Sequence, residues 1–424
     1  MAEASLTINR RKVAVSATRQ RVMGIVFILI GLAMLGLFAR ITAPDELTRF
    51  VMTPGGIKRG VMGVWILPSF TTMVALGSAA ILAGLYQLLR GFKRYTNLVL
   101  GVVVAAFVFS FLVWAAAGGS LNLAGMLGSA VLLAVPITLG AFSGILSERA
   151  GVVNIAIEGM MLMGAMVGAL VGSITDSLWL GVLAAVLAGL LLALVHGVLS
   201  IKYKINQIIS GTVINIFATG FTSYISAKFL QVYQDLNSAP IFPRWPVPVL
   251  ADIPLIGPIF FNTNFFVYAM FILMIILQVA LFYTRWGLRL RSVGEHPKAA
   301  DTLGINVFRT RYMAVMLSGM MAGLGGAYFT LGSVGRFDEM MTAGRGFIGL
   351  AAMIFGNYTP IGAFGSGVLF GMADAIASKL SILGSTIPPQ FMSMAPYITT
   401  MIVLAGVIGR SQAPAADGVA YEKE

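Results

Sequence analysis

Long apolar runs separated by short polar breaks are the feature that most constrains this chain. Of its 424 residues, 58% are hydrophobic and only 10% are charged, a composition typical of membrane proteins. A run of about 20 apolar residues forms a helix long enough to cross the hydrocarbon core of a bilayer. The sequence therefore predicts an all-α fold, a polytopic helical bundle with about 12 membrane segments that include broken or short helices.

The twelve segments differ in strength. Two of them, 152–173 and 345–357, are Gly-rich, spotted with polar residues or short, and we expect them to be tilted or broken helices. The others are long enough to span. These predicted spans are 22–39, 61–89, 97–117, 123–142, 178–201, 205–227, 263–283, 311–332, 361–380 and 391–409.

The formal net charge of +12 raises the question of a polyanionic partner. With the N-terminus on the cytoplasmic side, most Lys and Arg residues fall in cytoplasmic loops, and far fewer fall outside. This positive-inside bias explains the charge, so we expect no nucleic acid as a partner. The chain has no cysteine, which excludes disulfides and cysteine-based metal sites.

A polar pair interrupts the weak segment 152–173. Asn154 and Glu158 are four residues apart and would share one face of a helix. Inside a membrane such a pair faces the bundle interior or a water-filled cavity. One interpretation places both residues on a substrate path. The other makes them structural, with Glu158 capping a broken helix or bonding to a neighbouring helix.

A second polar feature is a stripe on the predicted span 205–227. Its spacing of four residues keeps the stripe on one face of a helix, which suits a path for a neutral polar solute better than a path for an ion. Hydrogen bonding between helices is the competing explanation. The stripe consists of Gln207, Gly211, Asn215, Thr219 and Ser223, and Thr138, Asp374, Ser393 and Thr399 are further candidates on other segments.

Catalytic motifs are missing from the sequence. The only histidines, His196 and His296, do not form H-E-x-x-H, and Asp374 has no second intramembrane aspartate beside it. The stretch "GRGFIG" at 344–349 lacks the preceding strand of a dinucleotide site, and no G-x-x-x-x-G-K-[ST] motif occurs. The chain is therefore not expected to be an enzyme, and any ATP hydrolysis must come from another chain.

The segment 283–313 is dense in charge and lies between two strong spans. Pro297 suits the start of a helix, and "PKAADTLGI" predicts a short amphipathic helix that ends at Gly304. Such a helix, held under the membrane by flanking spans, would give a partner a place to push on the bundle. An ordinary basic loop is the alternative.

Four long stretches resemble one known family. "SERAGVVNIAIEGMMLMGA", "NQIISGTVINIFATGFTSY", "TRWGLRLRSVGEHPKAADTLGINVFRTRYMAVMLSGMMAGLGGAYFTLG" and "FDEMMTAGRGFIGLAAMIFGNYTPIGAFGSGVLFG" are similar to permease subunits of ABC importers. The likeness is to the nucleoside and simple-sugar branch, related to ribose and branched-chain amino acid permeases. It covers 123–410 and leaves the first 120 residues or so unexplained.

The resemblance implies the partners of the chain. It implies a second permease subunit, commonly a different paralogue, two cytoplasmic ATPase subunits that carry ATP and Mg, and an extracytoplasmic substrate-binding protein. This chain itself would bind no cofactor or metal, and membrane lipid would surround it. The protein would lie in a prokaryotic cytoplasmic (inner) membrane with both termini in the cytoplasm.

The resemblance also assigns residues. The coupling loop that docks on the ATPase would comprise Gly294, Glu295, Pro297, Ala299, Ala300 and Gly304, and Phe347 would narrow the substrate path. Together with the residues noted above, the predicted path consists of Asn154, Glu158, Gln207, Asn215, Thr219 and Phe347. The predicted organisation is a basic N-terminus at 1–21, an extension of about three transmembrane helices at 22–120, a permease core at 121–410 and a disordered cytoplasmic tail at 411–424.

The predicted function is import of a neutral polar solute, with nucleosides first and simple sugars of the ribose or galactose type second. An ion-coupled secondary transporter is the rival class, because polar stripes and broken helices occur there too. Such a transporter usually contains internal repeats and has no need of a docking loop.

Overall fold

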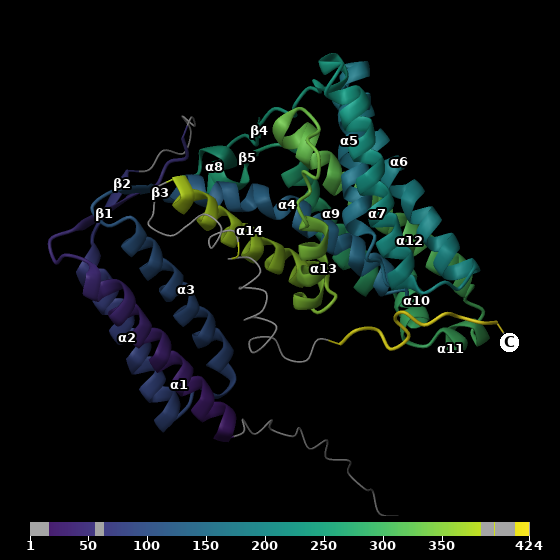
Figure 1. Cartoon of the computed structure of the whole chain (residues 1–424). Helices are drawn as coiled ribbons and strands as arrows, with labels where there is room; N and C mark the ends of the chain where they lie inside the picture. Colours follow the sequence, from purple (N-terminus) through teal and green to yellow (C-terminus); the bar gives the residue numbers. More distant parts are fainter. Residues whose placement is uncertain (1–16, 56–62, 383–393, 395–411, 424) are drawn as a thin grey trace, which may run out of the picture. The chain divides into compact units, whose positions relative to one another are not determined.

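The computed structural model describes residues 17–55, 63–382, 394 and 412–423. The chain packs as two compact units (Figure 1). Unit 1 comprises Met1–Met52 and Gly63–Leu123, and unit 2 comprises Thr53–Met62 and Ala124–Glu424.

Unit 1 is a three-helix bundle with a small sheet at one end of the helices (Figure 1). Helices α1 and α2 approach closely because glycines face each other, and a Cβ added to Gly31 would lie 2.7 Å from the carbonyl oxygen of Gly77. In the sheet, β1 lies between an antiparallel β2 and a parallel β3. The elements are α1 (Ala17–Ala33), β1 (Leu47–Val51), β2 (Val64–Pro68), α2 (Ser69–Leu89), α3 (Thr96–Ala115) and β3 (Ser120–Asn122).

The predicted span 61–89 is wrong at its start. Helix α2 begins at Ser69, and the residues before it form β2. Val64, Trp65 and Ile66 are β-branched or aromatic residues of the kind that strands favour, and β1 supplies their backbone partners. Pro68 then ends the strand and directs the chain into the helix.

Unit 2 contains the remaining helices and one short antiparallel pair of strands. Its elements are α4 (Leu123–Glu148), α5 (Ile157–Thr175), α6 (Leu178–Gly197), α7 (Gln207–Ile225), β4 (Trp245–Pro246), α8 (Ile256–Phe260), β5 (Asn262–Thr263), α9 (Phe265–Tyr283), α10 (Arg285–Glu295), α11 (Pro297–Thr302), α12 (Val307–Phe329), α13 (Arg345–Phe355) and α14 (Pro360–Ile382). Single π-helical turns extend α6, α7 and α12 as Val198–Lys202, Ser226–Leu230 and Thr330–Val334.

The polytopic helical fold is confirmed. In the described part of the chain, 10 helical segments are long and apolar enough to cross a membrane. The weak segment 152–173 corresponds to α5, and the weak segment 345–357 corresponds to α13. Helix α13 has 11 residues, so it is about 16 Å long and spans roughly half of a hydrocarbon core. The predicted span 391–409 lies outside the described residues.

Helix α12 packs between α5 and α6 through its glycines. A Cβ on Gly319 would lie 2.4 Å from the carbonyl oxygen of Gly189 on α6, and a Cβ on Gly326 would lie 2.0 Å from that of Met161 on α5. No other residue type fits at these distances. The small residues that the sequence places at regular spacing on this segment therefore bring three helices into backbone contact.

The described tail, 412–423, does not match the predicted disorder. It has no helix or strand, but it lies against α10 and α11 (Figure 1). Its backbone bonds to α10 through Ala416, and its side chain Tyr421 is only 6% exposed. Its alanines, charged residues, Pro414 and Gly418 follow no periodic pattern. Tertiary contacts and not local structure hold this segment.

Candidate functional site

The polar pair of the weak segment does not share a helix face. Helix α5 begins at Ile157, so Asn154 lies in the turn before it and only Glu158 is helical. Asn154 is fully buried. Its Oδ1 accepts from the backbone N–H of Ala156 at 3.0 Å, and its Nδ2 donates to Ser318 of α12 at 2.9 Å. Asn154 thus ties the broken start of α5 to α12.

Glu158 caps the short helix α13. Its Oε1 accepts from the Gly344 backbone N–H at 2.8 Å and from the Thr342 hydroxyl at 2.6 Å, and its Oε2 accepts from the Gly346 N–H at 2.7 Å. A carboxylate suits this place because the first N–H groups of a helix lack intrahelical partners and carry partial positive charge. The geometry agrees with the capping interpretation of Glu158.

The glycine-rich start of α13 makes this contact possible. A Cβ on Gly346 would lie 2.7 Å from both Cα and N of Glu158. Side chains cannot approach backbone that closely, so the "GRGF" stretch is required for α13 to meet α5. Helix α13 begins within this stretch, at Arg345, with Gly344 as its N-cap.

The predicted stripe on α7 faces the broken start of α5. Gln207 accepts from the Val153 N–H at 2.7 Å. Asn215 accepts from the Gly159 N–H at 2.8 Å and donates to the carbonyl of Ile155 at 2.9 Å. These amides replace hydrogen bonds that a continuous helix would make with itself. Their position matches the helix-to-helix interpretation of the stripe.

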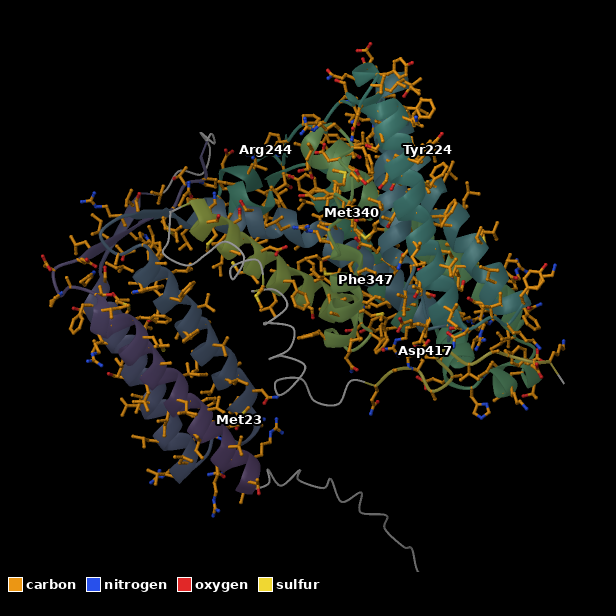
Figure 2. All side chains as sticks on the ribbon, viewed as in Figure 1. Met23, Tyr224, Arg244, Met340, Phe347 and Asp417 are labelled. Atoms are coloured by element: carbon orange, nitrogen blue, oxygen red, sulfur yellow. The ribbon has the colours of Figure 1, made fainter. Side chains whose placement is uncertain are left out.

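Two predicted path residues do not join this network. Thr219 is half-buried and donates to the carbonyl of Asn215 in its own helix at 2.9 Å. Phe347 is 47% exposed and is labelled on α13 in Figure 2. Of the predicted set, Thr219 and Phe347 are thus the residues whose side chains are not bonded to the backbone of another helix or turn in this network.

A charge pair joins α13 to α14. Arg345 and Asp374 approach to 3.4 Å between Nη2 and Oδ2, with side chains 23% and 18% exposed. Asp374 was a further polar candidate from the sequence, and Arg345 was not. An arginine and an aspartate within apolar segments neutralise each other. The pair fixes α13 at the end that Glu158 caps.

The charged segment between α9 and α12 contains two helices. Helix α11 starts with Pro297 at its first position, and the Nδ1 atom of His296 accepts from the Ala299 N–H at 3.4 Å. Gly304 follows with φ +80°, a backbone conformation that favours glycine. The predicted short helix is therefore confirmed.

Helix α10 was not predicted, although the sequence carries its signal. Thr284 accepts from the Gly287 N–H as an N-cap at 3.2 Å. Trp286, Leu290 and Val293 then follow at a spacing of four and three residues, with Leu290 and Val293 fully buried. We refer to Arg285–Thr302 as the α10–α11 segment.

One side of the α10–α11 segment is buried and the other is exposed. Gly294 packs so closely that a Cβ would lie 2.2 Å from the carbonyl oxygen of Arg149, and Ala300 is 2% exposed. Glu295, Ala299 and Gly304 are exposed, and Leu303 after α11 is 82% exposed. The predicted coupling residues thus divide into a rear side that anchors the segment and an open side. The open side is available to another chain.

Arg149 holds the loop after α4 on this same end. Its Nε donates to the carbonyl of Tyr358 at 3.0 Å, and its guanidinium lies over the rings of Phe282 and Tyr358. Burial lowers the pKa of Arg149 from its ordinary value, and the neighbouring charge of Arg291 lowers the pKa further. Within the described residues, no group of three or more His, Asp or Glu side chains is placed to hold a metal ion.

Comparison with known proteins places these features in a family. Residues 126–408 match the family described as the branched-chain amino acid transport system permease component. No solved structure matches the chain.

Three curated relatives resemble most of the chain. The guanosine ABC transporter permease protein of Bacillus subtilis (strain 168) is 41% identical over 306 residues, which cover 69% of this chain and 95% of the relative. The nucleoside ABC transporter permease protein of Lactococcus lactis subsp. cremoris is 40% identical with the same coverage. A putative glucose ABC transporter permease protein of Haloferax volcanii is 34% identical over 311 residues, covering 68% of this chain and 93% of the relative.

Proposed function

Because this chain belongs to the family of ABC transporter permeases, we propose that it forms part of the path by which nucleosides cross the membrane, driven by ATP. The observation that carries the substrate class is the 41% identity to the guanosine permease over 95% of that relative's length. The chain is a transport subunit and not an enzyme. ABC permeases work with ATPase subunits and a binding protein, and we assign ATP and Mg to the ATPase.

The open side of the α10–α11 segment is the proposed ATPase contact. Ala299, Gly304 and Leu303 offer a small, largely apolar surface, while Gly294 and Ala300 lock the segment onto the ends of α4 and α12. A segment held this way moves with the helices behind it. The six predicted coupling residues therefore include an exposed part that can contact the ATPase and a buried part that anchors the segment to the permease.

The polar residues divide between shaping and lining the path. Asn154, Glu158, Gln207 and Asn215 bond to backbone groups and hold α5, α7 and α13 in place. Thr219 bonds within its own helix and Phe347 is 47% exposed, so we assign contact with the solute to these two residues. Phe347 is exposed on α13 and would narrow a path completed by a second permease, which we expect to be a different paralogue.

We place the α10–α11 segment in the cytoplasm, on the inner side of a prokaryotic cytoplasmic membrane, with both termini on that side. Arg285, Arg289 and Arg291 lie on α10, in agreement with the positive-inside bias. Helices α7 and α12 run away from this end towards a polar cavity of about 540 Å³, lined among others by Gln231, Gln234 and Arg336. We assign this opposite side to the binding protein.

Uptake measurements test the proposal. Labelled guanosine, ribose and glucose are supplied to cells with and without the gene, before and after ATP depletion that preserves the ion gradient. Guanosine uptake that requires both the gene and ATP is the expected result. Gene-dependent uptake of a sugar alone would favour the sugar permease, for which the 34% identity to the glucose relative is the supporting observation. Uptake that follows the ion gradient would favour a secondary transporter.

A point variant tests the docking surface separately. Ala299→Glu places a carboxylate on the open side of α11, where Ala299 is exposed and the fold tolerates a larger side chain. We expect more than a tenfold loss of uptake, with normal membrane insertion and weaker co-purification of the ATPase. Asp45→Asn, a charge change on an exposed residue of unit 1, is the control. Equal uptake in both variants would remove the docking assignment.

A further inference from the structure

The tail 412–423 lies across the α10–α11 segment and bonds directly to it. The Ala416 N–H donates to the carbonyl of Gly294 at 2.9 Å, and the Ala415 N–H donates to Oε2 of Glu295 at 3.2 Å. Figure 1 shows the tail running beside α10 and α11. Both acceptors lie at the C-terminal end of α10, directly before α11.

The same tail bonds to three other elements of unit 2. The Gln412 N–H donates to Oδ1 of Asn357, in the turn between α13 and α14, at 3.1 Å. Nη1 of Arg311, on α12, donates to the carbonyl of Val419 at 2.9 Å. Lys204, before α7, forms an ion pair with Glu422. Twelve residues thus connect parts of the chain that are more than 50 positions away in sequence.

An aromatic side chain anchors the tail. Tyr421 is 6% exposed and packs in a small cluster with Val293 of α10, Ala300 of α11 and Val307 of α12. Its ring centroid lies 5.4 Å from that of Phe308. Because the cluster takes one residue from each helix, Tyr421 fills the space where the α10–α11 segment meets α12. Burying an aromatic ring contributes more than the exposed contacts of the tail.

A buried ionic group lies under the tail. Arg311 is 2% exposed, and the charge of Asp417 acts on it. Asp417 also lies close to Glu148 at the end of α4, and the two carboxyl groups interact. Figure 2 marks Asp417 on the tail. Without the tail, the buried guanidinium would lose this carboxyl group and the Val419 carbonyl, which is costly.

We propose that 412–423 is a clamp that holds the α10–α11 segment on the ends of α4 and α12, so that motion of the docked ATPase reaches these spans. This inference rests on the proposed function. The clamp stays closed through the transport cycle, because its contacts, apart from the bond to Glu295, lie on the rear side of the segment and leave Ala299 and Leu303 free. Tyr421, Asp417 and Arg311 are positioning residues and do not touch the solute.

The test compares the full chain with a chain ended before Gln412 and with Tyr421→Ala. Tyr421→Phe keeps the ring and Lys423→Ala changes an exposed residue of the same tail, and these are the matched controls. Guanosine uptake and guanosine-stimulated ATP hydrolysis are measured per assembled complex, together with the amount of ATPase that co-purifies with the permease.

The clamp predicts a separation of these readouts. The truncated chain and Tyr421→Ala still insert and still bind ATPase, but uptake per complex falls at least tenfold and the stimulated hydrolysis is lost. Tyr421→Phe and Lys423→Ala stay within about twofold of wild type. Unchanged uptake per complex in the truncated chain overturns the clamp. So does a loss of uptake that matches a loss of inserted protein.

Hydrogen exchange distinguishes failure of the clamp from failure of the proposed function. In the full complex, amides of the α10–α11 segment should exchange at least tenfold faster when the tail is removed, and this result does not depend on the solute. If wild type imports no guanosine but shows this change, the substrate assignment fails and the clamp stands. If exchange is the same with and without the tail, the clamp fails whatever the solute.

Discussion

The start of α5 and the tail both bury polar groups, but the buried groups have different partners in the two places. At the start of α5, side chains satisfy backbone groups that a broken helix leaves open, as Asn215 does for Gly159 and Glu158 does for Gly346. At the tail, charged side chains balance one another, as Asp417 does for Arg311. The first junction is fixed by backbone geometry, and the second by compensating charges together with the buried ring of Tyr421. The first should therefore tolerate change far less.

The largest effect is expected from Gly346→Ala. The added Cβ would lie 2.7 Å from backbone atoms of Glu158, which cannot move aside as a side chain would. Overpacking of this kind costs about 1–3 kcal/mol and displaces the capped end of α13, so uptake should fall more than tenfold. Gly365→Ala on α14 is the control, because a Cβ there meets no atom within 4 Å. Uptake and thermal stability of both variants check the prediction, and similar values for the two would contradict it.

Asn215→Leu should lower the amount of stably assembled protein. It leaves the Gly159 N–H and the Ile155 carbonyl without partners, at about 1–3 kcal/mol for each unsatisfied group. We expect a several-fold loss of detergent-stable protein, with near-normal uptake per remaining molecule. Ile216→Leu, at a neighbouring residue that is 68% exposed, is the control. A full amount of stable protein with impaired uptake would return Asn215 to the path lining.

The sequence predicts the features that repeat or that carry their own local signal. Apolar runs of about 20 residues mark the spans, and Pro297 with Gly304 marks α11. The five-residue strand β2 was missed because its partner β1 provides the stabilising bonds. Asn154 was placed on a helix because polar spacing alone does not reveal that α5 begins at Ile157.

The site was harder to predict than the spans. Polar residues at Glu158 and Asn215 were visible, but their roles depend on which backbone groups stand opposite them. Gly344 is 186 positions from Glu158, and no local pattern links the two. The tail was missed for the same reason, since Tyr421 gains its burial from Val293, Ala300 and Val307.

A smaller effect is expected from pH at the tail. Burial raises the pKa of Asp417 to about 6, against about 3.9 in an unfolded chain. The folded state therefore binds the proton of the Asp417 carboxyl group more tightly than the unfolded chain does. The stability that this protonation contributes is present below about pH 4 and is lost as the pH rises through about 6. The groups that face Asp417 and Glu148 are Arg311 on α12, Tyr358 and, beside Tyr358, Arg149.

Asp417→Asn removes this titration and keeps the shape of the side chain. The difference in denaturation temperature between wild type and the variant should decrease as the pH rises from about 4 to about 6. Above about pH 6 the difference should stay constant. Thermal denaturation of the purified full chains at several pH values measures this difference. A difference that does not change across that range would show that Asp417 does not titrate in the folded protein.

The smallest effect is expected from Lys204→Ala. Lys204 pairs with Glu422, but the two side chains are 41% and 74% exposed, and water and salt screen such pairs. The lysine lowers the pKa of Glu422, so the attraction is present at neutral pH and is lost on acidification. Uptake should stay within twofold of wild type, while Tyr421→Ala in the same cells should lose most of it. If Lys204→Ala lowered uptake as much as Tyr421→Ala, the exposed ion pair and not the buried ring would hold the tail. The start of α5 and the tail would then differ in the position of their charged groups.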